Sequence, residues 1–381
     1  MVGRVSRRRV KVVVAMSGGV DSSVAAALLK QAGHEVIGIT MQVHPDEEVG
    51  EPRRFGGCCG VSDVLDAARV ARKLDMRHYV VNFREVFARE VIDDFCREYL
   101  AGRTPNPCIR CNRYLKFDAL LTRARQLDAD RVATGHYAQI EFDEDGRRYR
   151  LLKGVDGGKD QSYVLYGMTQ EQLGYSLFPV GGLAKQEVRD IAGQLDLPVA
   201  DKPESQDICF VADDDYAGFV TKHTGREPRP GPILDAADGR VLGEHRGIAS
   251  YTVGQRRGLG ITTKGAEPRY VVAIDPERNA VIVGAREEVY GDELTASTLN
   301  WIAFDRLEAP IAVTAKIRYR HEAAAATVAP LGGDDADIGD VGVTFREPQP
   351  AIAPGQAVVF YDGDAVVGGG SIARVARGVV A

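Results

Sequence analysis

The residues Ser17–Ser23 form a short segment whose composition suits the binding of phosphate. They read Ser-Gly-Gly-Val-Asp-Ser-Ser, follow an apolar run and precede a stretch rich in Ala and Leu. Two adjacent glycines let the backbone approach an anion closely, and the start of a helix adds a positive partial charge. The segment lacks the Lys-Ser/Thr ending of a Walker loop and the G-x-G-x-x-G of a dinucleotide fold. It predicts a phosphate-binding loop; the plain alternative is a capped helix after a tight turn.

Three cysteines have a spacing that suits sulfur or metal chemistry. Cys108 and Cys111 form a C-x-x-C pair in a loop that contains Pro105 and Pro107, and Cys209 lies far downstream. Such a pair can be a redox couple, half of a metal site or two reactive thiols. The prolines stiffen the loop and fix the directions in which the sulfur atoms point.

The remaining cysteines are interpreted as structural. The chain has 6 Cys among 381 residues, too few for a disulfide scaffold. Cys96 lies beside Phe95 on one face of an expected helix, where a thiol behaves as a small apolar group. Cys58 and Cys59 lie in a glycine-flanked loop, and we favour small loop residues over additional thiols of the site.

These groups must be positioned by alternating strands and helices in the first half of the chain. The expected strands span 10–15, 36–41, 78–82 and 131–135, and the expected helices span 20–32, 61–74, 84–101, 115–127 and 185–195. Strands separated by helices imply right-handed crossovers and a mostly parallel sheet. The predicted fold class is therefore α/β for this half, with the phosphate loop following the first strand.

The second half of the chain has a different texture, rich in Gly and in short alternating segments. Residues 218–272 carry nine Lys or Arg against five Asp or Glu, a local charge of +4. Residues 313–320 alternate between apolar and mostly basic side chains, which predicts one strand with a basic face; that face comprises Lys316, Arg318 and Arg320. Asp362-Gly363 between two apolar runs predicts a hairpin. We expect a domain at 1–212, a small central domain at 213–278 and an all-β barrel at 279–381.

Composition excludes several classes of protein. Hydrophobic residues make up 44% and charged residues 27%, which is ordinary for a globular protein. Apolar runs fall far short of the roughly 20 residues that a membrane-spanning helix needs. The basic start, Met1–Lys11, is interpreted as a solvated arm and not a secretion signal, so the cytoplasm is the expected location. The net charge of −6, taken alone, argues against a nucleic-acid partner, whereas the basic central segment could supply phosphate contacts.

Longer motifs resemble a known family. The phosphate segment alone resembles the loop of the N-type ATP pyrophosphatases, the PP-loop superfamily with an adenine nucleotide alpha hydrolase-like domain. The match to the tRNA-specific 2-thiouridylases runs from Ala15 to about Gly370, and its motifs are long and in order. It rests on the phosphate loop, AGRTPNPCIRCN at 101–112, ATGHY at 133–137, KDQSY at 159–163, ICF at 208–210, GQRRGLG at 254–260 and PGQ at 354–356. The resemblance implies ATP-dependent 2-thiolation of the wobble uridine of tRNA, with the anticodons of Lys, Glu and Gln tRNAs as targets.

The resemblance also implies binding residues. It assigns ATP contacts to Ala15, Met16, Ser17, Gly18, Gly19, Val20, Asp21, Ser22, Met41 and Gly135. It assigns tRNA contacts to Asn106, Pro107, Cys108, His136, Lys159, Asp160, Gln161, Arg318, Tyr319 and Gln356. Asp21 would help to position Mg²⁺, since hard cations prefer carboxylate and phosphate oxygens. Strict alternation cannot place Arg318 and Tyr319 on one face, so we expect the strand to end near Tyr319.

The resemblance also implies catalytic roles, with a persulfide on Cys209 and the partner nucleophile on Cys111. Adenylation makes the C2 oxygen of uridine a leaving group, and the second thiol then releases the sulfur. Some family members carry Asp where this chain has Cys108, and a thiol cannot copy a carboxylate. An alternative is therefore an iron–sulfur cluster or a zinc ion held by Cys108, Cys111 and Cys209. A cysteine desulfurase or a sulfur-relay protein would supply the sulfur.

Plainer interpretations exist for several of these residues. His136 after a strand can be a structural histidine, and the basic face around Arg318 can be a solvated surface. Two other functions compete with tRNA thiolation: an ATP pyrophosphatase acting on a small molecule, and a non-catalytic RNA-binding protein with a metal-stapled loop. The first has no need of the cysteines or of a basic β domain, and the second has no need of an intact phosphate loop.

Overall fold

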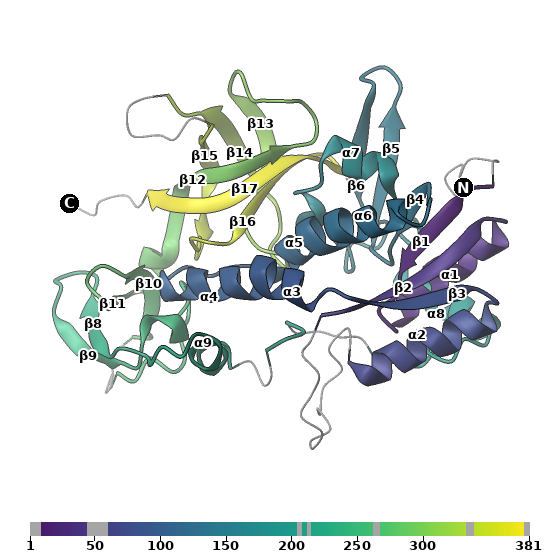
Figure 1. Ribbon diagram of the computed structural model, residues 1–381. Coiled ribbons are helices and arrows are strands. Elements are labelled where there is room, and N and C mark those ends of the chain that lie inside the picture. The colour runs from purple at the N-terminus through teal and green to yellow at the C-terminus, as the bar shows by residue number, and fades with distance from the viewer. Residues whose placement is uncertain are drawn as a thin grey trace. The chain divides into compact units, whose positions relative to one another are not determined.

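The computed structural model describes residues 9–43, 60–203, 208–211, 215–261, 267–332 and 339–376 (Figure 1). The chain divides into two compact units. The first comprises Met1–Ile92, Pro107–Ala212 and Asp364–Val366, and the second comprises Asp93–Asn106, Asp213–Gly363 and Val367–Ala381. The domain limits predicted at 212/213 and 278/279 stay predictions.

The first unit is built on a five-stranded parallel sheet with the order β3-β2-β1-β4-β7. Its strands are β1 (Lys11–Ala15), β2 (Glu35–Gln42), β3 (Arg77–Asn82), β4 (Arg131–Ala133) and β7 (Ser176–Leu177). The helices that alternate with these strands include α1 (Val20–Gln31), α2 (Val61–Lys73) and α8 (Lys185–Gln194). The predicted α/β class and its parallel sheet are confirmed.

Burial explains why the central strand has no polar face. Val12, Val13 and Val14 are each fully buried, although successive side chains of a strand point to opposite faces. Val12 and Val14 pack in one core with residues of α1, α2 and α8. A parallel strand covered on both faces must be apolar throughout, which is why the β-branched run at the start of the chain forms β1.

Two helical stretches differ from the prediction. The helix expected at 84–101 is a succession of α3 (Arg84–Phe87), the π-helical η1 (Ala88–Ile92) and α4 (Asp93–Leu100). The helix expected at 115–127 begins earlier and comprises α5 (Pro107–Arg110), the π-helical η2 (Cys111–Ala119) and α6 (Leu120–Arg125). Proline is well suited to a first helical position. The early turns escaped the apolar pattern because Ile109, Arg110 and Cys111 are only half-buried.

The remaining elements of the first unit are a hairpin and several short helical segments. They are β5 (Ala138–Asp143), β6 (Arg148–Lys153), the 3₁₀ helix η3 (Ser162–Leu165) and α7 (Gln170–Tyr175). Strands β5 and β6 pair antiparallel, and Leu152 of β6 pairs with Ala365.

The second unit holds a small central domain. Its sheet has the order β10-β11-β8-β9 and a core that includes Ile233, Val271 and Val281. The elements are α9 (Tyr216–Thr224), β8 (Gly231–Asp235), β9 (Val241–His245), η4 (Ile248–Ser250), β10 (Tyr270–Asp275) and β11 (Ala280–Gly284). Helix α4 packs beside α9, where the rings of Tyr99 and Tyr216 stack with centroids 6.0 Å apart.

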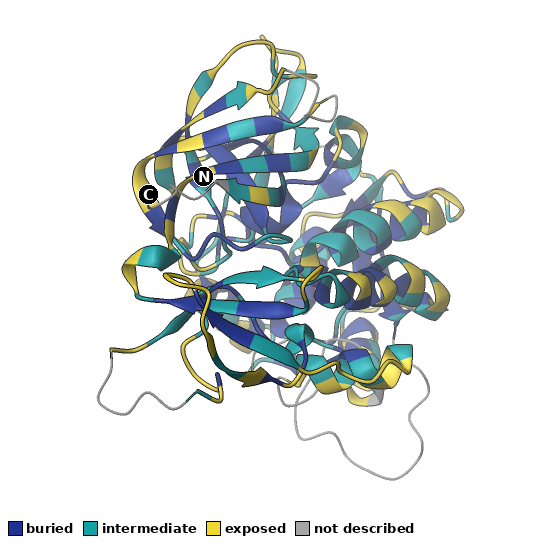
Figure 2. Ribbon diagram, turned by 90° about the vertical axis from the view of Figure 1, so that its left-hand side faces the viewer, coloured by how far each residue is buried: buried dark blue, intermediate teal, exposed yellow. Residues whose placement is uncertain are grey.

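The second unit also holds the C-terminal barrel. Its strands follow the order β12-β15-β14-β13-β16-β17, and an additional pairing of β12 with β17 closes the ring. They are β12 (Tyr290–Trp301), β13 (Ile311–Lys316), β14 (Ala324–Pro330), β15 (Val341–Pro350), β16 (Ala357–Asp362) and β17 (Ala365–Ala376), and the 3₁₀ helix η5 (Glu287–Val289) precedes them. Figure 2 shows buried and less buried residues alternating along the barrel strands, as period-two patterning requires. The predicted barrel and its Asp362-Gly363 hairpin are confirmed, with Gly363 at φ +58°.

One prediction for the barrel is wrong. Lys316, Arg318 and Arg320 do not share one strand, because β13 ends at Lys316 and the chain turns at 317–320. Arg318 Nη2 donates to the carbonyl oxygens of Val253, at 3.3 Å, and of Ala351. The Arg318 guanidinium thus satisfies backbone acceptors of two other segments instead of joining a basic strand face.

Candidate functional site

The phosphate loop joins β1, the central strand, to α1, and its geometry requires glycine. Gly18 has φ +72°, and a Cβ at this residue would lie 2.2 Å from the Asp63 carbonyl oxygen. A Cβ on Gly135 would lie 2.6 Å from the backbone nitrogen of Ser22. The Ser22 hydroxyl accepts from the Ser17 N–H at 3.3 Å. The loop is thus a close-packed backbone turn at the start of a helix, which is the arrangement that binds phosphate.

Asp21, in the first turn of α1, is the acidic centre of the loop. Its Oδ1 accepts hydrogen bonds from the Tyr137 hydroxyl at 2.7 Å and from Lys185 Nζ at 2.6 Å. The Lys185 side chain is 11% exposed and that of Asp21 is 32% exposed. A carboxylate held by a buried cation and still partly open to solvent suits a role beside a charged ligand.

Lys202 is a second cation at the loop, and it comes from the chain segment that leads to Cys209. Its Nζ donates to the Gly18 carbonyl oxygen at 3.0 Å and to carboxylates of α2, those of Asp63 and Asp66, at 2.7 Å each. Asp63 in turn accepts from the Gly60 N–H at 2.9 Å, so it also caps α2.

Most of the other residues assigned to ATP binding lie in the interior. Met16, Val20 and Met41 are buried, and Ala15 ends β1. The Met16 N–H donates to the Ile39 carbonyl oxygen at 2.8 Å, and the Met16 carbonyl accepts from the Thr40 hydroxyl at 2.9 Å. These residues support the loop, and their ATP contacts stay predictions.

The two cysteines assigned to catalysis lie on segments that share one support. Cys111 begins η2 and is half-buried, as is Cys209, whereas Cys108 in α5 is exposed. Phe210, next to Cys209, packs edge to face on Phe87 of α3 with centroids 5.6 Å apart. Arg110, next to Cys111, donates from Nε to the Glu90 carbonyl oxygen in η1. The neighbours of both thiols are therefore attached to the α3–η1 stretch of the first unit.

Asn112 anchors the start of η2. Its side chain is buried and donates from Nδ2 to the Val164 carbonyl oxygen at 3.0 Å. Val164 belongs to η3, just after the Lys159-Asp160-Gln161 segment. The Cys111 segment and this segment are thereby joined.

The cluster alternative for the three cysteines is not supported. Across the part of the chain that the structure describes, no group of three or more His, Cys, Asp or Glu side chains is arranged to hold a metal ion. Cys108, Cys111 and Cys209 all lie in that part. The three thiols are therefore not placed as ligands of one iron–sulfur cluster or zinc ion in the described residues. Cys58 and Cys59, also considered in the sequence, lie outside the described residues.

His136 is buried and neutral. Burial, followed by the charge of Lys116, lowers its pKa well below the ordinary value of 6.5. Its Nδ1 lies 2.6 Å from the Thr134 hydroxyl, and its Nε2 lies 3.4 Å from Lys116 Nζ and must accept there. The ring also packs against Phe117 and Phe178. The structural interpretation accounts for these contacts, and the tRNA contact stays a prediction.

Two of the three residues at 159–161 are bound within their own unit. Asp160 is buried and accepts from the N–H groups of Gly154 and Ser162, each at 3.0 Å, and from the Ser162 hydroxyl at 2.9 Å. Gln161 Oε1 accepts from the Tyr137 N–H at 3.0 Å. Lys159 is half-buried. The segment thus braces Tyr137, which reaches Asp21, and its RNA contacts stay predictions.

In the second unit, a residue that the resemblance assigns to tRNA contact is also hydrogen-bonded to the protein backbone. Gln356 Nε2 donates to the Thr104 carbonyl oxygen at 2.8 Å, and the Thr104 N–H donates to the Pro354 carbonyl oxygen at 2.8 Å. Asn106 is half-buried in this unit, whereas Pro107 is buried in the first. Lys316 Nζ lies 5.8 Å above the ring of Tyr319. RNA contacts of these residues also stay predictions.

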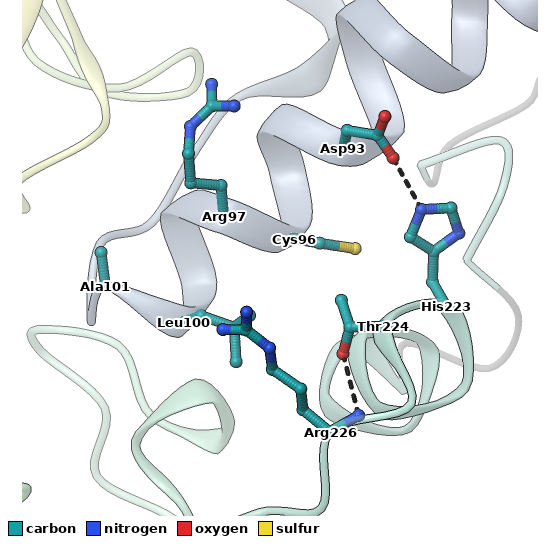
Figure 3. Close-up of a pocket in the computed structure, with 8 residues that line it drawn as sticks. All are labelled: Asp93, Cys96, Arg97, Leu100, Ala101, His223, Thr224 and Arg226. Atoms are coloured by element: carbon teal, nitrogen blue, oxygen red, sulfur yellow. Dashed lines mark hydrogen bonds and ion pairs between the residues drawn. The ribbon is translucent and has the colours of Figure 1, made fainter.

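A cavity of about 430 Å³ lies in the second unit between α4 and α9. Figure 3 shows Asp93 joined to His223, with Cys96 pointing between the two helices. Burial, followed by the nearby charge of Asp93, raises the pKa of the Cys96 thiol to about 11. A buried, protonated thiol supports the structural interpretation of Cys96.

Sequence reasoning missed the side chains that surround the loop. Lys185, Lys202, Asp63 and Asp66 are single charged residues with no local pattern to distinguish them. Among the residues around the loop that were missed, only Tyr137 lay in a motif noted in the sequence, as the last residue of ATGHY. The remaining contacts exist only because distant segments fold together.

A phosphate loop that leaves the central strand of a parallel sheet defines a PP-loop nucleotide-binding domain. A family model described as tRNA methyl transferase HUP domain matches residues 10–213. Models described as tRNA methyl transferase PRC-barrel domain and aminomethyltransferase beta-barrel domain match 217–285 and 291–372.

Curated relatives narrow this class. The tRNA-specific 2-thiouridylase MnmA 1 of Thermoanaerobacter sp. strain X514 is 54% identical over 367 residues, which cover 96% of this chain and 99% of the relative. The tRNA-specific 2-thiouridylase MnmA of Moorella thermoacetica is 54% identical over 96% of this chain and 100% of the relative. The chain belongs to the family of tRNA-specific 2-thiouridylases, and the predicted resemblance is confirmed.

A solved 4-thiouridine synthetase–RNA complex with bound ATP is also similar, at 18% identity, covering 57% of this chain and 50% of that chain. Its TM-score is 0.36. Separately, no helix within the described ranges has the length and apolarity needed to cross a membrane.

Proposed function

We propose that this chain catalyses ATP-dependent 2-thiolation of the wobble uridine of tRNA. The observation that carries the proposal is that one unit holds both a phosphate loop and the two cysteine segments, with Lys202 bridging the loop to the segment of Cys209. The family implies the use of ATP, and 54% identity over nearly the whole chain supports the same reaction.

The first step is adenylation of the base. The C2 oxygen of uridine attacks the α-phosphorus of ATP, an O–P bond forms, and pyrophosphate leaves. The N–H groups of the phosphate loop and the N-terminus of α1 would hold the departing phosphates. Asp21 would hold Mg²⁺ on them, and it fits because it is a hard oxygen donor at the mouth of a glycine-lined turn.

The second step replaces the adenylated oxygen by sulfur. The terminal sulfur of a Cys209 persulfide attacks C2, and AMP leaves with the oxygen. The Cys111 thiolate then attacks the Cys209 sulfur, which leaves the transferred sulfur on C2 and forms a Cys111–Cys209 disulfide. Alternatively, Cys111 forms that disulfide first and releases hydrosulfide, which attacks C2. In both routes the sulfane sulfur is reduced and two thiols are oxidised, so a dithiol reductant must restore the enzyme.

We further propose the partners. The anticodons of Lys, Glu and Gln tRNAs are the expected substrates, a cysteine desulfurase or sulfur-relay protein is the expected donor, and the cytoplasm is the expected location. The basic central segment would supply phosphate contacts for the RNA.

The test measures AMP and pyrophosphate with and without tRNA, in the presence of a sulfur-loaded cysteine desulfurase. We expect both products only with a transcript that carries uridine at the wobble position, and a matched transcript with cytidine there is the control. Products formed without any tRNA would favour a small-molecule ATP pyrophosphatase. Binding of tRNA without either product would favour a non-catalytic RNA-binding protein.

A further inference from the structure

Lys202 makes three hydrogen bonds that no local pattern in the sequence predicts. Its ammonium lies within 3.0 Å of the Gly18 carbonyl oxygen and within 2.7 Å of one carboxylate oxygen each of Asp63 and Asp66. The side chains of Lys202, Asp63 and Asp66 are 25%, 7% and 20% exposed. Three acceptors therefore surround one largely buried cation beside the phosphate loop.

The charge of this group is well defined. Burial lowers the pKa of Lys202, but the hydrogen bonds and charges of Asp63 and Asp66 outweigh it and leave the pKa raised. The side chain is thus an ammonium at neutral pH, and charge-assisted hydrogen bonds of this kind are stronger than neutral ones. Loss of Lys202 would leave two carboxylates facing each other without their shared cation.

The position of Lys202 in the chain gives these contacts a consequence for Cys209. The chain between α8 and Lys202 is bound to α8 through Arg189, whose Nη1 donates to the Ala200 carbonyl oxygen at 3.1 Å. Beyond Cys209, Phe210 packs on Phe87. Only seven peptide units separate Lys202 from Cys209, a span of at most about 25 Å when extended. The thiol therefore lies on a short tether whose upstream end is attached to the phosphate loop.

We propose that Lys202 is a positioning residue that ties the Cys209 segment to the phosphate loop, so that sulfur is delivered where the nucleotide is held. This inference rests on the proposed function, and it assigns Lys202 to sulfur transfer and not to adenylation. Lys202 touches neither reacting sulfur, so its contribution lies in the placement of the persulfide relative to the adenylated base.

The test compares Lys202→Met with Lys73→Met. Lys73 is a matched control because it also joins α2 to the chain after α8, through an ion pair with Asp196 at 2.7 Å, but it does not contact the loop. Each full-length variant is given ATP, tRNA and a desulfurase loaded with sulfur. The readout is the ratio of 2-thiouridine formed to pyrophosphate released, because pyrophosphate reports adenylation alone. Hydrogen exchange at 208–211 is measured in parallel.

We expect Lys202→Met to lower the ratio of 2-thiouridine to pyrophosphate by about 10- to 100-fold, the loss that a misplaced reactant causes. Exchange at 208–211 should rise in this variant, and Lys73→Met should change neither readout. The variant Lys202→Met/Asp63→Asn removes the more buried of the two carboxylates, whereas Asp66 keeps its ion pair with Arg69 at 3.2 Å. It therefore keeps the test valid if the single variant folds poorly. It should show the same low ratio.

An unchanged ratio in a folded Lys202 variant, or an equal fall of the ratio in Lys73→Met, would overturn the inference while leaving the proposed function intact. Absence of 2-thiouridine with the wild type would overturn the proposed function itself. Rescue of the ratio by Lys202→Arg, which keeps the cation, would support the positioning role.

Discussion

The substitution Gly18→Ala tests whether the phosphate loop is built as described. Gly18 has φ +72°, and the added Cβ would lie 2.2 Å from the Asp63 carbonyl oxygen and 2.8 Å from its Cα. A left-handed conformation costs an L-residue about 1–2 kcal/mol. Forcing a methyl group into packed backbone costs about 1–3 kcal/mol more. Because Asp63 caps α2 and binds Lys202, the start of that helix must move to relieve the contact.

Gly33→Ala is the matched control. Gly33 also has a positive φ, +86°, but a Cβ there meets nothing within 4 Å. We expect it to lose only the conformational term, so Gly18→Ala should be less stable than Gly33→Ala by about 1–3 kcal/mol in urea unfolding. Calorimetric titration should also show ATP affinity falling at least about tenfold in Gly18→Ala and unchanged in Gly33→Ala. Equal stability and equal ATP affinity of the two variants would refute the loop geometry.

Three further substitutions address the site. Asp21→Ala should abolish AMP release while tRNA binding persists; normal AMP release by the folded variant would remove Asp21 from adenylation. The pKa of His136 is lowered in the folded protein, so below pH 6.5 the unfolded chain binds more protons than the folded protein does. The stability that comes from the neutral ring is therefore present above pH 6.5 and is lost on acidification. His136→Gln should therefore flatten the decline of the free energy of unfolding between pH 6.5 and 5 by up to about 1.4 kcal/mol per pH unit, and an unaltered slope in urea titrations would contradict this. If Arg318 contacts an RNA phosphate, Arg318→Ala should reduce the slope of log tRNA affinity against log salt concentration by about 0.7–0.9. A lower melting temperature with an unchanged slope would mean that Arg318 only binds the carbonyl oxygens of Val253 and Ala351.

Local patterns were sufficient for the sheet and the loop. A β-branched run followed by Gly18 and Gly19 specifies a strand, a left-handed turn and a helix within a few residues, so neighbours alone decide the outcome. Asp362-Gly363 specified its hairpin for the same reason. By contrast, the alternation at 313–320 continues in the sequence past the end of β13. A local pattern carries no information about the contact of Arg318 with a carbonyl group that is distant in the sequence.

The charged surroundings of the loop could not be predicted at all. Lys185 and Lys202 meet Asp21 and Asp63 across more than a hundred residues of chain. Such pairs depend on tertiary packing and leave no periodic trace. For His136 the sequence left two interpretations open, a tRNA contact and a structural histidine. Its burial beside Lys116 fits the structural interpretation.

Nucleoside analysis of tRNA after reaction tests the central claim most directly. Wild-type protein, Cys111→Ser and Cys209→Ser are each incubated with ATP, a wobble-uridine tRNA and a sulfur-loaded cysteine desulfurase. We predict 2-thiouridine and AMP release only with wild-type protein, pyrophosphate release by all three, and an extra sulfur on Cys209 in the mass spectrum of the wild type. Formation of 2-thiouridine by Cys209→Ser, or extra sulfur confined to Cys58 or Cys59, would contradict the assignment.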